Sequence, residues 1–487
     1  YTVIPPSGTF RDLIGELDFI IGHLGCRIIQ LLPIHPTPTT YARMGRFGSP
    51  YASLSFTAVD PALAEFDPKA TPLEQFIELV DAVHARGARL LLDIAINHPG
   101  WAASLHGSHP QWLARETDGH IETPGAWGVV WADLTRLDYG NTDLWPYMAD
   151  VFVTWCRRGV DGFRCDAGYM IPTQTWRYII GKVHDQFPDT LFFLEGLGGK
   201  ISVTRDLLNR ADFNWAYSEL FQNYDRGQIE HYLPEALSIS QADGTTIHFA
   251  ETHDNPRLAA TSATYARMRT ALCALLSVQG GFAFANGVEW LATEKIDVHD
   301  AAPLNWGALP NQVDHIRRLN ALLTSHPVFA HGTRIEMVQQ GPGNAIAALR
   351  QRGDGTGSLL ILVNLDATTP VAVAWPTARS PFQGDRAIDL LTGEALTLER
   401  QSGRTQLTLA AGQARCLSNN PDDLERIGRT EKGFPRTPQG VERQRLRATA
   451  MAVWGFYHGL SDLGQWDPDQ AAARLQAAPL DFCREVN

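Results

Sequence analysis

Short apolar runs alternate with stretches whose apolar residues recur at helical spacing over most of this 487-residue chain. The runs are typical of buried strands, and the periodic stretches, such as 10–24 and 141–158, are typical of helices that pack against a sheet. The strand candidates are 27–33, 89–98, 160–166, 191–195, 246–255 and 280–285, with weaker ones at 1–4 and 212–217. This alternation of strand and helix predicts an α/β fold with a parallel sheet.

Helix and loop signals between the strands support this prediction. Thr71, Pro72 and Glu74 form the pattern of a capping box with proline at the first helical position, so a helix should begin there. Another helix is expected over 257–278. The segment 99–140 shows no regular pattern, and loops of that length are uncommon and usually functional.

The pattern changes near residue 330, where short strand candidates are separated by glycine and proline turns. They are 335–339, 345–350, 358–364, 371–375 and 387–391. Such spacing is typical of an all-β sandwich. We therefore expect an α/β domain at 1–330, a β-sandwich domain at 331–418, and a linker with a helical tail at 419–487. The tail shows no obvious closure, so the natural protein is expected to continue beyond it.

Polar residues gather where four of the strand candidates end. Arg164 and Asp166 are two residues apart, so their side chains share one face of a strand and the guanidinium would hold the carboxylate ionised. An isolated pair of this kind is more often a structural ion pair. The other three strand ends carry Asp93, Asn97 and His98, then Glu195, and then His253, Asp254 and Asn255.

This ordered set resembles the four signature regions of the α-amylase family, glycoside hydrolase family 13. The resemblance implies a (β/α)8 TIM barrel over 1–330, with 1–4 as the remnant of the first strand and the active site at the C-terminal ends of the strands. It also implies that 99–140 is a loop domain after strand 3 that closes over the cleft. The C-terminal all-β sandwich fits the family too.

Cleaving the acetal between two sugars requires one carboxylate at the anomeric carbon and one carboxylic acid that protonates the leaving oxygen. By resemblance, Asp166 is the nucleophile, Glu195 is the general acid/base, and Asp254 grips sugar hydroxyls and distorts the ring. Glu195 leaves the uncharged run 191–194, where burial would favour its protonated form. The expected outcome is a covalent glycosyl-enzyme and net retention at α-1,4-glucosidic bonds.

The resemblance also supplies a substrate-binding set and a metal. Tyr51, in a loop rich in proline, glycine and threonine, would stack on the sugar beside the scissile bond. The remaining members of the set are His98, Arg164, His253, Asp93 and Asn255. No cofactor is required for the chemistry. In many relatives an asparagine equivalent to Asn97 binds a structural calcium, and Asp133 and Asp138 are available oxygen ligands here.

One departure from the family pattern bears on the reaction. Many amylases carry Lys-His three and four positions after the nucleophile, where this chain has Tyr169 and Met170. Pro172 is more similar to maltosyltransferases and to the glucanotransferase part of glycogen-debranching enzymes. This favours 4-α-glucanotransferase or maltosyltransferase-type transfer. The alternatives are an α-amylase-type endo- or exo-hydrolase of starch, glycogen or maltodextrin, and a catalytically silent glucan-binding protein.

Composition and charge limit the classes of molecule that this protein can bind. The net charge of −12, without a basic stripe, argues against nucleic acid and is compatible with a neutral α-glucan oligo- or polysaccharide. No apolar run approaches the about 18 residues that a membrane span needs. The six cysteines are far apart, without CxxC or zinc spacing, so we expect buried thiols, a reducing compartment and a cytoplasmic protein.

Overall fold

The computed structural model of this protein describes residues 1–3, 8–126, 128–242, 244–300, 303–355, 357–433, 438–458 and 467–487. The side chains at 241–242, 438–445 and 468 are outside this description. The chain divides into two compact units. The first unit contains Tyr1–Thr2, Phe193–Asp297 and Ala302–Phe434, and the second contains Val3–Phe192, Val298–Ala301 and Pro435–Asn487.

One eight-stranded sheet has the order β1-β2-β3-β6-β7-β8-β9-β10, which follows the chain. Its strands are β1 (Thr2–Val3), β2 (Ile28–Leu31), β3 (Arg89–Ile94), β6 (Gly162–Cys165), β7 (Leu191–Leu194), β8 (Trp215–Tyr217), β9 (Thr245–Phe249) and β10 (Phe282–Ala283). The pairs β2–β3, β3–β6, β7–β8, β8–β9 and β9–β10 are parallel. Thr2 also pairs with Ala285, just beyond β10, so the first strand meets the last. The expected (β/α)8 barrel is confirmed; Ile4 of the expected first strand lies outside the described residues.

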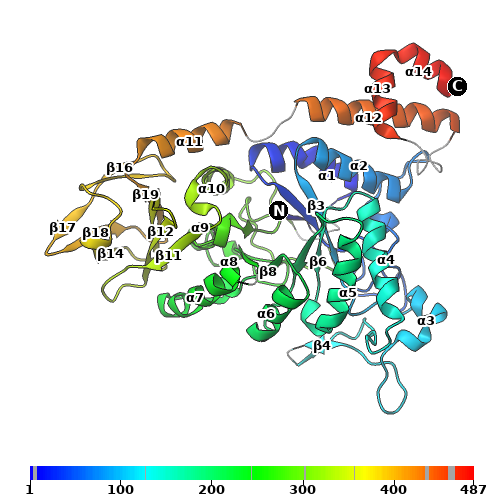
Figure 1. Ribbon diagram of the computed structural model, residues 1–487, viewed down its shortest axis with the longest axis horizontal. Helices are drawn as coiled ribbons and strands as arrows, with labels where there is room; N and C mark the ends of the chain where they lie inside the picture. The colour runs from blue at the N-terminus through cyan, green and yellow to red at the C-terminus, as the bar shows by residue number, and fades with distance from the viewer. Residues whose placement is uncertain are drawn as a thin grey trace. The chain divides into compact units, whose positions relative to one another are not determined.

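In the second unit, helices lie beside the strands β2, β3 and β6 (Figure 1). They are α1 (Phe10–Leu17), α2 (Pro72–Ala85), α4 (Leu144–Arg157) and α5 (Thr173–His184). The predicted capping box opens α2, because the Glu74 amide donates to the Thr71 hydroxyl and the Thr71 amide donates to the Glu74 carboxylate. The helix predicted over 10–24 is present as α1 followed directly by a π-helical segment, Asp18–His23.

The segment 99–140 is less irregular than its sequence indicates. It contains the short helix α3 (Ser104–Ser108), a 3-10 turn at Pro110–Trp112, and an antiparallel pair of strands, β4 (Gly125–Ala126) and β5 (Val129–Val130). The prediction that this segment lacks regular structure is therefore wrong.

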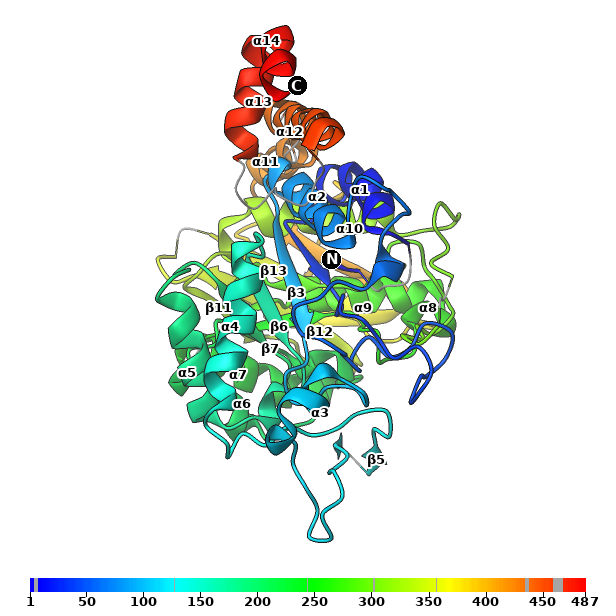
Figure 2. The same cartoon turned by 90° about the vertical axis from the view of Figure 1, so that its right-hand side faces the viewer.

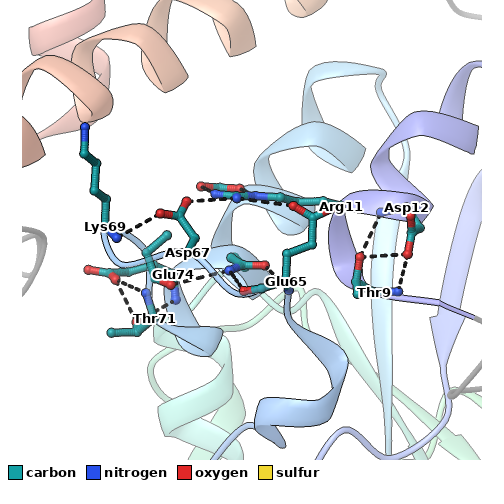
Figure 3. A network of polar contacts seen from close by, with 11 residues as sticks. Thr9, Arg11, Asp12, Glu65, Asp67, Lys69, Thr71 and Glu74 are labelled. Atoms are coloured by element: carbon teal, nitrogen blue, oxygen red, sulfur yellow. Dashed lines mark hydrogen bonds and ion pairs between the residues drawn. The ribbon is translucent and has the colours of Figure 1, made fainter.

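The helical tail belongs to the second unit and lies beside α1 and α2 (Figures 1 and 2). Its helices are α12 (Pro438–His458), α13 (Pro468–Ala477) and α14 (Pro479–Val486). Arg447 of α12 forms an ion pair of 2.9 Å with Asp81 of α2. Below α12, Arg11 donates to Asp67 and Glu78, and Lys69 points towards the tail (Figure 3).

The first unit contains α6 (Ile201–Arg210), α7 (Arg226–Ala242), α8 (Leu258–Thr261), α9 (Ala263–Leu275), α10 (Val313–Ser325) and α11 (Pro421–Lys432). The prediction of one helix over 257–278 is wrong. Ser262 has an extended backbone that separates α8 from α9, and its side chain accepts a hydrogen bond from the Tyr265 amide, which caps α9. Serine favours this capping role over a helix interior.

The first unit also contains two antiparallel sheets, with orders β11-β12-β13-β19-β15-β16 and β14-β18-β17. The strands are β11 (Thr333–Met337), β12 (Ala345–Arg352), β13 (Ser358–Asn364), β14 (Val371–Pro376), β15 (Arg386–Asp389), β16 (Ala395–Thr397), β17 (Glu399–Gln401), β18 (Arg404–Leu409) and β19 (Ala414–Ser418). Alternate residues of β12 and β13 belong to two different core clusters, so both faces of the larger sheet are buried. One cluster includes α9 and α10 residues, and the other includes Trp375 of β14.

The domain boundaries at 330 and 418 stay predictions, because the compact units group the barrel strands differently. Within the described ranges, no helix has both the length and the apolar character that crossing a bilayer requires. Five of the six cysteines are buried, and Cys483 is partly exposed.

Candidate active site

Arg164 organises a polar cluster in the second unit, where β3 and β6 end. The two strands pair in parallel, with Asp93 and Arg164 in register. Arg164 Nη1 donates to the two carboxylate oxygens of Asp93 at 3.0 and 2.9 Å, and to Asp166 Oδ1 at 2.5 Å. Because Arg164 and Asp93 are almost fully buried, these charge-assisted hydrogen bonds are stronger than they would be in water.

Tyr51 extends this cluster. Its hydroxyl donates to Asp93 Oδ2 at 3.0 Å, and its ring centroid lies 6.0 Å from the guanidinium carbon of Arg164. Burial raises the pKa of Asp93, and the charge of Arg164 opposes that rise. The Asp166 side chain keeps 17% of its surface exposed. Arg164 therefore fixes Asp166 in orientation while leaving it accessible to a ligand.

His98 is the next neighbour of Asp166. Its Nε2 lies 3.9 Å from Asp166 Oδ2, and its ring centroid lies 5.6 Å from that of Trp131. Burial lowers the pKa of His98, so the imidazole is neutral near pH 7. Nδ1 lies 3.2 Å from the Asn97 amide nitrogen and accepts a hydrogen bond from it, so Nε2 carries the proton of the neutral ring. Nε2 is buried and has no hydrogen-bond partner among the described residues.

The backbone turns sharply after Asp166. Ala167 has φ +46°, in the left-handed region that residues with a Cβ rarely adopt, which costs about 1–3 kcal/mol. A 3-10 turn, Gly168–Met170, follows, and Trp176 Nε1 of α5 donates to the Gly168 carbonyl at 2.9 Å. The buried Trp176 therefore helps to hold the strained turn that presents Asp166.

In the first unit, Glu195 directly follows β7. It is 8% exposed, and its Oε1 accepts a hydrogen bond of 2.9 Å from the Leu197 amide. In the same loop, the Gly198 amide donates to Glu219 Oε1 at 2.7 Å. Glu195 is thus held at a strand end and is nearly covered, as the sequence predicted for the position.

The loop after β9 carries the other residues predicted in the first unit. His253 is 7% exposed, whereas the Asp254 side chain is 71% exposed, with 3.4 Å between His253 Nε2 and Asp254 Oδ2. Asn255 Oδ1 accepts from the Thr252 hydroxyl at 2.8 Å, which stabilises the loop from within. The Thr252 hydroxyl oxygen also accepts from the Asp254 amide.

Sequence reasoning missed the pair that closes this loop. Arg257 Nη1 donates to Glu251 Oε1 at 2.9 Å, and the Leu258 amide donates to Glu251 Oε2 at 2.7 Å. Arg257 Nη2 also donates to the Asn286 carbonyl at 2.8 Å. Both charged side chains are buried, so they tie the two ends of the loop together. The signal in the sequence was an acid and a base that bracket the motif at 252–256.

The structure brings Tyr51, Asp93, His98, Arg164 and Asp166 together in the second unit. The first unit carries Glu195, His253, Asp254 and Asn255 at the ends of β7 and β9. The convergence of Asp166 with Glu195 and Asp254 in one cleft stays a prediction.

Calcium at Asn97 stays a prediction. The Asn97 amide nitrogen lies 3.2 Å from His98 Nδ1 and 3.5 Å from Met170 Sδ, which fixes the orientation of the side chain. Asp138 Oδ1 accepts from the Gly140 amide. In the part of the chain that the structure describes, no group of three or more His, Cys, Asp or Glu side chains is placed to hold a metal.

The chain is similar in sequence to known maltosyltransferases. No family model matches the chain. An α-1,4-glucan:maltose-1-phosphate maltosyltransferase of Cereibacter sphaeroides is 27% identical over 392 residues, which cover 74% of this chain and 56% of the relative. Maltosyltransferases of the same name from Rhodospirillum rubrum and Myxococcus xanthus are 26% and 27% identical, with 54% and 59% of their lengths covered. The chain therefore spans just over half the length of these relatives.

Solved structures resemble the fold. An α-amylase from Lactobacillus plantarum superposes with a TM-score of 0.70 at 23% identity, over 85% of this chain and 97% of that one. A trehalose-6-phosphate hydrolase of Bacillus licheniformis superposes with a TM-score of 0.67 at 15% identity, over 86% and 98%. These likenesses establish the barrel fold. The predicted resemblance is confirmed: this chain has the fold of the α-amylase family and is similar in sequence to maltosyltransferases.

Proposed function

We propose that this chain is a retaining α-glucan-active enzyme that transfers glucan pieces between chains, of the 4-α-glucanotransferase or maltosyltransferase type. The observation that carries the proposal is the cluster where β3 and β6 end. There Arg164 fixes a partly exposed Asp166 beside the neutral imidazole of His98. The similarity to maltosyltransferases supports transfer, and the α-amylase fold supports chemistry at the C-terminal ends of the barrel strands.

The reaction runs in two displacements. In the first, a carboxylate oxygen of Asp166 bonds to the anomeric carbon, the bond to the leaving oxygen breaks, and Glu195 gives that oxygen its proton. In the second, Glu195 takes the proton of an acceptor hydroxyl, which attacks the anomeric carbon and releases Asp166. Two inversions give net retention. Both steps use carboxylates, so neither requires a cofactor.

The remaining residues of the set act on the sugar beside the broken bond. His98 Nε2 donates to a hydroxyl of that sugar, and His253 does the same from the first unit. Tyr51 stacks on the ring, and Asp254 accepts from hydroxyls and favours a distorted ring. Arg164 holds Asp166 in place through a direct hydrogen bond, and Asp93 acts through Arg164, which it orients.

The donor is a glucan chain or a maltosyl phosphate, the second because the relatives' names contain maltose 1-phosphate. With a glucan donor, the leaving oxygen belongs to another sugar. With maltosyl phosphate it belongs to inorganic phosphate. An α-amylase-type hydrolase has the same first step but accepts water in the second, and a catalytically silent glucan-binding protein has neither.

One experiment separates these functions. The protein is incubated with maltoheptaose alone, and with maltoheptaose plus maltose 1-phosphate, and the products are resolved by chain length. Longer and shorter chains from maltoheptaose alone indicate glucan transfer, and extension with phosphate release indicates maltosyl transfer. If only shorter chains form, the protein is a hydrolase and the proposal of transfer is wrong. If the substrates are unchanged, the protein is not an enzyme that acts on them.

The assignments of Asp166 and Glu195 have their own test. We expect Asp166→Asn and Glu195→Gln to abolish turnover while glucan binding persists. Glu219→Gln is the matched control for Glu195, because Glu219 lies in the same unit and accepts from the amide of a neighbouring loop residue. Full activity of Glu195→Gln would disprove its role as acid/base.

We further propose a cytoplasmic location and an α-glucan, not a nucleic acid, as the macromolecular ligand. The five buried cysteines and the net charge of −12 support these two proposals.

A further inference from the structure

An open hollow of about 470 Å³ lies on the second unit between α4 and α5. None of the residues predicted for the active site lines it. Its walls carry two aromatic rings and four long polar side chains: Trp145, Tyr178, Gln174, Arg177, Lys182 and Asp185.

The two rings form an inclined pair. Trp145 in the first turn of α4 and Tyr178 of α5 have ring centroids 6.0 Å apart and planes at 55°. Both side chains are partly exposed, although aromatic rings of this size bury well. Trp145 Nε1 donates to the Tyr139 carbonyl at 3.0 Å, which fixes the indole and leaves its carbon face to the hollow. The pair is a rigid, bent apolar surface.

The polar side chains around the rings are not engaged elsewhere. Gln174, Arg177 and Asp185 are exposed and form no side-chain hydrogen bond or ion pair with the other described residues. The Lys182 amine lies 6.0 Å from the Tyr178 ring centroid and forms no ion pair with the described residues. The hollow thus offers donors from Gln174, Arg177 and Lys182, and acceptors from Gln174 and Asp185.

We propose that this hollow is a second carbohydrate-binding site, which takes a segment of a neutral α-glucan chain. A pyranose ring has an apolar C–H face that stacks on an aromatic ring, and its hydroxyls need both donors and acceptors around them. The hollow carries two cations, Arg177 and Lys182, and one anion, Asp185, so its charge is close to balanced and favours a neutral ligand over a phosphate-rich one.

The position of the hollow gives the site a role. Tyr178 lies on α5, the helix that begins shortly after Asp166 in the same unit. A polymer held there stays attached to the unit that carries Asp166 between turnovers, which raises its effective concentration without any change in the chemistry. This inference rests on the proposed function for the identity of the ligand.

The test is affinity electrophoresis of the full chain in native gels that contain glycogen. The Asp166→Asn protein is the parent, so that the polymer is not consumed during the run. We expect Tyr178→Ala to raise the dissociation constant for glycogen about tenfold, which corresponds to about 1.4 kcal/mol. Gln174→Ala, at an exposed position where folding is not at risk, should raise it about threefold. Phe66→Ala is the matched control, because Phe66 is an aromatic residue of the same unit that is 98% exposed and outside the hollow.

The outcomes divide cleanly. The site is wrong if the parent is not retarded by glycogen, if Tyr178→Ala and Gln174→Ala migrate like the parent, or if Phe66→Ala weakens retention as much as Tyr178→Ala does. The proposed function fails separately, in the maltoheptaose assay of the unmodified protein. A protein that is inactive there but retarded by glycogen through Tyr178 would keep the site and lose the activity.

Discussion

Removing the charge of Arg164 should destabilise the protein strongly, and the effect should depend on pH. Arg164→Met leaves Asp93 fully buried without its cationic partner and leaves Asp166 with 17% exposure. Breaking a buried ion pair from one side typically costs about 3–5 kcal/mol. Arg89→Met is the control, because Arg89 pairs with Asp161 at 3.4 Å but keeps 56% of its side chain exposed. An exposed pair contributes about 1 kcal/mol or less.

The sign of the pH effect follows from Asp93. Burial and the neighbouring Asp166 both raise its pKa, and Arg164 is the group that opposes them. Without Arg164, the folded-state pKa of Asp93 moves further above the unfolded value of about 4. A carboxyl whose pKa is raised by folding binds a proton more tightly in the folded state, so the folded state loses stability as pH rises between the two values. The penalty of Arg164→Met should therefore be smaller at about pH 5 than at about pH 8.

The assay is urea unfolding of the parent, Arg164→Met, Arg89→Met and the double variant Asp93→Asn/Arg164→Met, followed by tryptophan fluorescence at both pH values. The double variant should recover part of the loss, because it leaves no unpaired charge at position 93. Equal stability of Arg164→Met and Arg89→Met at about pH 8, or a larger penalty at acid pH, would refute the reasoning.

Three further predictions test other parts of the structure. Thr71→Ala should lower the free energy of unfolding by about 1 kcal/mol through loss of the cap of α2, whereas Thr71→Ser should not; equal denaturation midpoints would contradict this. Gly159→Ala should destabilise by about 1–2 kcal/mol, since φ is +93° and the new Cβ would lie 2.7 Å from a Val80 methyl; an unchanged thermal midpoint would disprove the clash. Arg257→Met should lower kcat on maltoheptaose by releasing the loop that carries Asp254, and unchanged kcat in a folded variant would exclude this positioning role.

Local periodicity predicted the alternation of strands and helices, whereas the barrel and the roles of the candidate site residues were implied by the resemblance to the α-amylase family. Arg164 and Asp166 share a strand face through the two-residue repeat of a strand, and the capping box before α2 is a contact within one turn. The bond from Arg164 to Asp93 was not foreseen. It depends on the register between β3 and β6, which brings together residues that are distant in the chain.

Two predicted helices differ from the observed ones, because apolar spacing does not show where a helix is interrupted or which type of helix forms. The stretch 257–278 is apolar and helical in composition. Ser262 interrupts it, because its side chain accepts a hydrogen bond from the Tyr265 amide and caps α9 instead of continuing a helix. The pattern at 10–24 indicated one helix, and the chain follows that path with a π-helical turn, which apolar spacing cannot distinguish from an α-helix.

The larger sheet of the first unit has apolar residues on both faces, one set against α9 and α10 and the other against β14. A protein shortened to end at Ala330 would lack the sheet that packs against α9 and α10. Leu272, Leu319 and Leu322 would then be exposed to water. Such a product should precipitate on expression. Anyone who wishes to produce the barrel separately should therefore retain the sandwich or replace those leucines with polar residues.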